Sequence, residues 1–277
     1  MVKKLTLLLC LVLLSFAGCN LSEDDSDSLS APDMGSPSDL SAFTGSVPSE
    51  DKALALFLAA YTAMNGAMSD LPDVSHVISP SILSSKMLQP KGQDGEEWND
   101  EVIHIGGGTI TLNGTENSTW TDFPPTFDPN KEYTFTDKEN INMTVDIENV
   151  TVPEFGTPTY TLNGKYVEKL NMSTTIKATT DSMGNPISES IKMSLSISEQ
   201  MGIAMSVSSS TGFGGKFIVS FPFEYSITDT AVTSPDDIPQ DLLEELANTT
   251  VTLNVYDNNN ALKYSIECHL EELLNME

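Results

Sequence analysis

The stretch IKMSLSISEQMGIAMSV, residues 191–207, decides the expected fold. Apolar side chains occupy nearly every second position from Ile191 to Val207, and most of the positions between them are serine or lysine. Because successive side chains of a β-strand point to opposite faces, this period of two predicts a strand with one buried and one wet face. The parity continues past Glu199 and Gln200, which predicts either one long bent strand or two strands in sequence.

The same period of two extends outward from this stretch in both directions. Turn-forming residues 181–186, DSMGNP, precede it and predict a hairpin. Pro222 interrupts the strand that follows, which predicts an edge strand or a bulge there. Further strands are expected at residues 141–147, 170–178, 217–227, 251–256 and 262–268. Strands with one wet face are typical of antiparallel sheets and not of the buried parallel sheets of α/β enzymes.

Two segments break this pattern and predict helices. Residues 51–70 are rich in alanine, leucine and methionine and leave little polar face, which favours a core helix over a membrane span. Ser234-Pro235-Asp236-Asp237 has the capping pattern that begins a short helix near residues 235–247. The expected class is therefore α+β and mainly β. The expected architecture is a curved antiparallel sheet, half-barrel or sandwich-like, packed on the apolar N-terminal helix.

Residues 1–18 have the pattern of a secretory signal peptide. Lys3 and Lys4 precede an apolar run that is too short to span a bilayer, and the run ends in Phe16-Ala17-Gly18-Cys19. An apolar residue, two small residues and a cysteine resemble the lipobox of bacterial lipoproteins. The resemblance implies that the Cys19 thiol carries a diacylglycerol and that the freed amine is acylated. It also implies anchoring to a membrane of the bacterial cell envelope, with the outer membrane favoured and the domain either periplasmic or surface-exposed.

The mature chain is expected to have two parts. Residues 19–50 contain seven acidic residues, no lysine and few large apolar side chains, which predicts a disordered acidic tether. Residues 51–277 are expected to form a single β-rich globular domain. The formal net charge of the whole chain is −27, which disfavours nucleic acid as a partner because its phosphates require a basic surface.

The sequence contains no recognisable catalytic or metal-binding motif, and we expect a non-enzymatic protein without a cofactor. Methionine suits adaptable lipophilic sites, and five methionines fall on expected apolar strand faces. These candidate ligand contacts are Met143, Met172, Met193, Met201 and Met205. The preferred hypothesis is a lipid-anchored module that binds a hydrophobic ligand. The alternative is a structural or adhesin-like lipoprotein that has a filled β core and binds an envelope protein through its polar sheet face.

Overall fold

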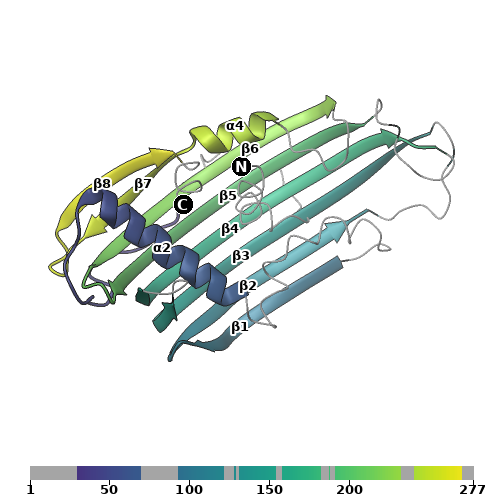
Figure 1. The fold of residues 1–277 in the computed structure, drawn as a ribbon. Helices are drawn as coiled ribbons and strands as arrows, with labels where there is room; N and C mark the ends of the chain where they lie inside the picture. The colour runs from purple at the N-terminus through teal and green to yellow at the C-terminus, as the bar shows by residue number, and fades with distance from the viewer. Residues whose placement is uncertain are drawn as a thin grey trace.

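The computed structural model describes residues 30–69, 93–121, 128, 131–153, 158–181, 187, 191–231 and 240–269. The strands form one sheet of eight, in sequence order from β1 to β8, and each pairs antiparallel with its neighbours (Figure 1). The elements are α2 (Glu50–Ser69), β1 (Gln93–Ile105), β2 (Gly108–Trp120), β3 (Glu132–Pro153), β4 (Thr159–Thr179), β5 (Lys192–Ser209), β6 (Gly214–Ala231), α4 (Gln240–Asn248), β7 (Thr250–Tyr256) and β8 (Leu262–His269).

This sheet confirms the prediction of a mainly β, antiparallel protein. All eight described strands belong to one open sheet, in which β1 and β8 are the outermost strands. A sandwich needs two facing sheets, so the sandwich-like alternative is not the arrangement that these strands form.

The stretch that decided the expected fold forms one continuous strand, β5. Its odd-numbered side chains from Met193 to Val207 lie on one face of the sheet and, apart from Met201, are buried. The aromatic strand that follows it is β6. Strand β7 pairs only with Lys216–Val219 of β6, so the later part of β6 forms an edge in the described sheet. Pro222 lies in that part, where its missing N–H leaves no ladder bond unmade, and the edge-strand prediction is confirmed.

The last expected hairpin and the second helix are also present. Strands β7 and β8 pair over Thr250–His269, and the Asp257 carboxylate accepts hydrogen bonds from the N–H groups of Asn259 and Ala261 at 2.8 and 3.0 Å. Helix α4 begins inside the range expected for the short helix, 235–247, and ends one residue beyond it. The capping sequence 234–237 lies outside the described residues.

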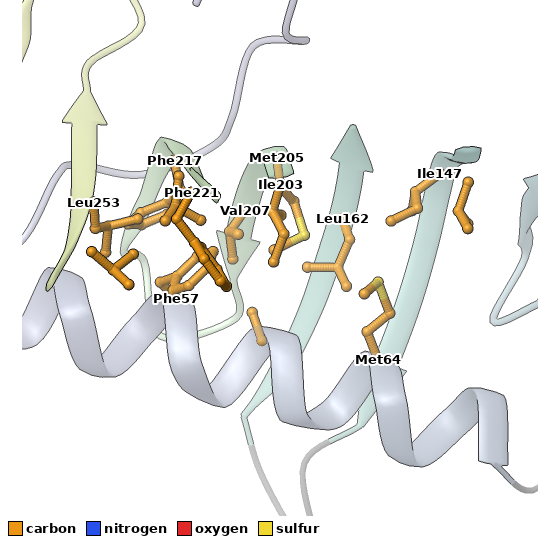
Figure 2. Packing of buried hydrophobic residues seen from close by; sticks show 14 of the residues in the cluster. Phe57, Met64, Ile147, Leu162, Ile203, Met205, Val207, Phe217, Phe221 and Leu253 are labelled. Carbon is orange, nitrogen blue, oxygen red and sulfur yellow. The ribbon is translucent and has the colours of Figure 1, made fainter. Parts of the chain in front are cut away.

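Helix α2 lies across one face of the sheet, which we call the helix face; the opposite side is the outer face (Figure 1). Phe57 and Met64 point toward the sheet (Figure 2), and the ring centroids of Phe57 and Phe217 are 5.6 Å apart. The buried positions of the helix form one stripe: Ala53, Leu56, Phe57, Ala60 and Met64. Ala55 and Thr62, on the other side of the helix, are exposed, so the helix is not covered all round.

Residues 30–48, which we call the strap, lie against the sheet, although the composition of residues 19–50 predicts a disordered tether. Residues 19–29 of that range lie outside the described residues. Met34 and Phe43 of the strap are buried against the sheet. Glycines make room for both, because a Cβ atom on Gly202 would overlap Met34 and one on Gly214 would overlap Phe43. The strap therefore supplies two apolar anchors to the outer face, in a segment whose overall composition is that of a disordered chain.

Polar contacts fix the strap in place. The Asn258 side chain binds the Phe43 backbone twice, accepting from its N–H at 3.0 Å and donating to its carbonyl at 2.8 Å. Lys216 on β6 is buried and donates to the Pro37 carbonyl at 2.9 Å and to Asn260 Oδ1 at 2.8 Å. The chain then passes the turn between β5 and β6, where Ser46 pairs with Phe213, and enters α2. One end of the sheet thus lies between the strap and α2.

Candidate functional site

The strand register determines which side chains meet on the helix face. Glu168 on β4 lies directly opposite Met143 on β3 and Met201 on β5. Two residues further along β4, Leu170 lies opposite Glu199 of β5. Directly opposed side chains have Cβ atoms about 4.5–5.5 Å apart, and diagonal neighbours are within reach of long side chains. Glu168 and Glu199 are diagonal neighbours of this kind.

The five methionines predicted to contact a ligand all lie on the helix face: Met143, Met172, Met193, Met201 and Met205. Met201 is half-buried and the other four are buried. Met143, Met172 and Met205 belong to the main apolar cluster that also contains residues of α2, and Met201 packs against it. Met193 lies apart from this cluster, opposite Ile176. Their role as ligand contacts stays a prediction.

Buried glutamates share this face with the methionines, and the sequence analysis did not single them out. Glu139 on β3, Glu168 and Glu199 are all buried. Their positions keep the parity of the apolar side chains around them, so the alternating pattern already placed them on the covered face. Burial of a carboxylate is costly unless it is paired, and this cost makes the group a candidate site.

Hydrogen bonding accounts for part of the group. The hydroxyl of Tyr166 donates to Glu168 Oε2 at 2.6 Å, a short charge-assisted bond. Burial raises the pKa of Tyr166 well above its usual value, and the charges of Glu168 and then of Tyr61 on α2 raise it further. The phenol of Tyr166 is therefore a fixed donor, and Tyr61 of α2 lies close enough to Tyr166 to affect its pKa.

Glu199 is the least satisfied member of the group. Burial, and after it the charge of Glu168, raises the pKa of Glu199 from 4.5 to about 8. At neutral pH this side chain therefore holds its proton. Glu199 is only 2% exposed, and its Oε2 atom has no hydrogen-bond partner among the described residues.

Ser118 adds a second buried polar group to the same face. It lies on β2 directly opposite Glu139, and its residue is 1% exposed. Its Oγ atom finds no hydrogen-bond partner in the described part of the chain. A buried polar atom without a partner costs about 1–3 kcal/mol, and the two such atoms lie three strands apart on this face, on β5 and β2.

Positive charge is confined to the other side of the central strands. The six lysines of β3 to β6 all have the parity of the outer face: Lys138, Lys165, Lys169, Lys177, Lys192 and Lys216. Lys177, for example, pairs with Asp229 there at 2.7 Å. None of these six side chains can neutralise the glutamates of the helix face.

Neither a metal site nor a membrane-spanning helix is found among the described residues. Across the described ranges, no three His, Cys, Asp or Glu side chains gather as a metal site requires. None of the described helices is both long and apolar enough to cross a membrane. Cys19 lies outside the described residues, so its lipidation stays a prediction. Comparison with known proteins finds no matching family model, no matching curated protein and no matching solved structure.

Proposed function

We propose that the protein is a non-enzymatic lipoprotein of the bacterial cell envelope, anchored through Cys19, whose helix face holds a hydrophobic ligand. In this proposal the sheet curves round α2 as a half-barrel, and the ligand lies beside the helix. Met143, Met172, Met193, Met201 and Met205 are its proposed contacts.

The length of the apolar surface carries the proposal. From Met193 to Val207 the apolar side of β5 covers fourteen residue steps, or about 48 Å at about 3.4 Å per residue. A helix with its side chains is only about 10–12 Å across. Helix α2 crosses this face near the end where β5 finishes (Figure 1). Much of the apolar face therefore lies beyond the helix, and in this proposal the ligand binds there.

The described side chains of this face are already shielded from water, which sets a condition on binding. A ligand has to displace the contacts that bury these side chains. We therefore expect association to be slower than the 10⁵–10⁷ M⁻¹s⁻¹ that is typical of preformed sites.

Ligand binding can be tested with the neutral lipophilic probe N-phenyl-1-naphthylamine and the mature chain carrying Cys19→Ser. We expect saturable fluorescence enhancement, and native mass spectrometry of protein purified from a bacterial host should show copurified lipophilic molecules. Met201→Gln, which keeps the side-chain length but adds polarity, should weaken binding several-fold. Leu262→Gln is the matched control, because Leu262 is 54% exposed on β8. Absence of saturable binding together with an empty mass spectrum would refute the carrier function.

The anchor requires its own test. Cys19→Ala should abolish incorporation of radiolabelled fatty acid when the full chain is expressed in a bacterium. Two or three acyl chains together hold a protein stably, whereas one chain gives only marginal binding. Persistent label in the variant, or no label in the wild type, would overturn the proposed location.

The outer face favours the alternative function, an interaction module for an envelope protein. Polar pairs link adjacent strands there: Thr136 with Thr175 at 3.2 Å, and Asn140 Nδ2 donating to Asn171 Oδ1 at 2.7 Å. A polar surface of this kind suits a protein partner. This function becomes the better account if the helix face takes up no lipophilic probe.

A further inference from the structure

Independently of any ligand on the helix face, the strap leads the chain onto a basic part of the outer face. Pro32 and Met34 both lie over Gly202 of β5, because a Cβ atom on this glycine would come within 3.0 Å of each. From there the strap runs to the turn between β5 and β6, where Ser46 pairs with Phe213. Followed backward from Met34 to Pro32, the chain therefore heads toward the beginning of β5.

The outer face in that direction carries lysine and no acidic side chain on three adjacent strands. Its side chains within residues 134–142 of β3, 169–177 of β4 and 192–200 of β5 are lysine, serine, threonine, asparagine or glutamine. We call this surface the basic patch, and its lysines are Lys138, Lys169, Lys177 and Lys192. In a chain with 40 acidic residues, the lack of any acid on these positions sets the patch apart from the rest of the molecule.

The positive charge of the basic patch is only partly balanced. Lys177 lies directly opposite Lys192, and it pairs with Asp229 of β6 at 2.7 Å. Lys169 is exposed between neutral residues of β3 and β5, and it takes part in none of the ion pairs among the described residues. Directly opposed like charges destabilise a sheet, so further negative charge would stabilise this surface.

The segment that directly precedes the strap has the complementary charge and a sufficient length. Residues 20–29, NLSEDDSDSL, contain four carboxylates and no lysine. Ten extended residues span up to about 35 Å, whereas the basic patch is about 27 Å long on β5 at about 3.4 Å per residue. The segment can therefore follow the patch along its whole length.

We propose that residues 20–29 lie along the basic patch, with their carboxylates beside Lys169 and Lys192. Exposed ion pairs are individually weak, so the contact depends on several pairs at once and is sensitive to salt. The docked segment extends the strap across the outer face. It also covers the surface that the alternative function assigns to a protein partner.

The mobility of a label at Cys19 tests this contact. The chain from Cys19 to Glu277 contains every described residue, and in this experiment it carries Cys268→Ala and an uncharged fluorophore on the Cys19 thiol. Time-resolved anisotropy measures the nanosecond motion of the label. The amplitude of this motion should at least double between about 10 mM and about 1 M NaCl, because the Debye length falls from about 30 Å to about 3 Å.

Charge-removing variants identify the lysines responsible. The double variant Lys169→Gln/Lys192→Gln should show the high-salt amplitude already at low salt, because two cations of the patch are lost. Lys263→Gln is the matched control, since Lys263 is exposed on β8 and already pairs with Asp257 at 2.9 Å. The control should keep the low amplitude of the wild type.

Each outcome supports or refutes the contact, and none depends on a ligand of the helix face. A label that is equally mobile at both salt concentrations refutes it. Sedimentation of the same chain with vesicles of phosphatidylglycerol, but not of phosphatidylcholine, would then assign the basic patch to an anionic membrane. Restricted motion that persists at high salt or in the double variant also refutes the proposal, because the lysines would not be what holds the segment.

Discussion

Replacing Glu199 with glutamine should remove a large pH dependence from the stability of the protein. The pKa of this carboxyl group is about 8 in the fold and 4.5 without burial, so the native state binds the proton more tightly than the unfolded chain does. Stability is therefore greatest where Glu199 is protonated in both states, and it falls as the pH rises from about 4.5 to about 8.

The size of the effect follows from the two values. At 1.36 kcal/mol per pH unit, ionising Glu199 in the fold costs about 5 kcal/mol once the pH is above 8. The cost is about 3 kcal/mol at pH 7 and about 1 kcal/mol at pH 5. Glutamine has the same shape and does not ionise, so the difference in free energy of unfolding between wild type and variant should change by about 4 kcal/mol between pH 5 and pH 9.

Urea unfolding followed by tryptophan fluorescence at each pH measures this difference. Titrating groups that do not interact with Glu199 contribute to both curves and cancel in the comparison, whereas the fixed cost of burying an amide shifts the variant equally at every pH. Glu224→Gln, on the exposed side of β6, should give a nearly constant difference. A constant difference for Glu199→Gln as well would show that Glu199 is not buried as described.

Two substitutions and two deletions test the packing of the N-terminal region. Phe57→Ala should lower the free energy of unfolding by about 3–5 kcal/mol, because it removes a buried ring that packs against Phe217. Ala55→Gln, on the exposed side of α2, is the control and should change the free energy of unfolding by less than about 0.5 kcal/mol. Equal, small effects in urea denaturation would mean that α2 does not pack on the sheet. Deleting residues 20–29 should leave the Tm within a few degrees, whereas deleting residues 20–46 removes both apolar anchors of the strap and should lower it by about 10 °C. Equal melting curves for the two deletions in scanning calorimetry would contradict the docked strap.

The alternation of side chains was enough to predict the sheet. In β5 the period of two is nearly unbroken, and the antiparallel class follows from one face being wet. The edge character of β6 at Pro222 was predictable for a similarly local reason, the missing N–H. These features depend on residues close together in the chain, so a single sequence carries them.

The strap was not predictable because its contacts are remote in sequence. Phe43 is held by Asn258, 215 residues away, and the local composition around it is acidic and rich in serine. Met34 and Phe43 of the strap pack where Gly202 of β5 and Gly214 of β6 have no side chain. A glycine in a strand does not by itself indicate that another segment packs on it. Composition averages over a window and misses two anchors placed nine residues apart.

The glutamates show a different limit. Parity placed Glu168 and Glu199 on the covered face, but strand register determines whether two glutamates on neighbouring strands become neighbours, and register depends on how the whole sheet is assembled. The sequence therefore predicted on which face of the sheet these glutamates lie, but not that they are neighbours. The methionines drew attention first because their chemistry suggests a lipophilic site without reference to any partner.

The docked strap shortens the distance that an anchored domain can reach from the membrane and determines which contacts break first under force. If Cys19 carries the lipid, only residues 19–29 separate the lipid from the strap, and these eleven residues span about 40 Å at full extension. A tether of all 32 residues from 19 to 50 would span more than about 100 Å. A pull on the anchor would load the contacts of Met34 and Phe43 before it reached the ladder of the sheet. Detachment of the strap would then lengthen the extended link between lipid and sheet by nineteen residues, or about 65 Å, and the eight-stranded sheet would remain intact.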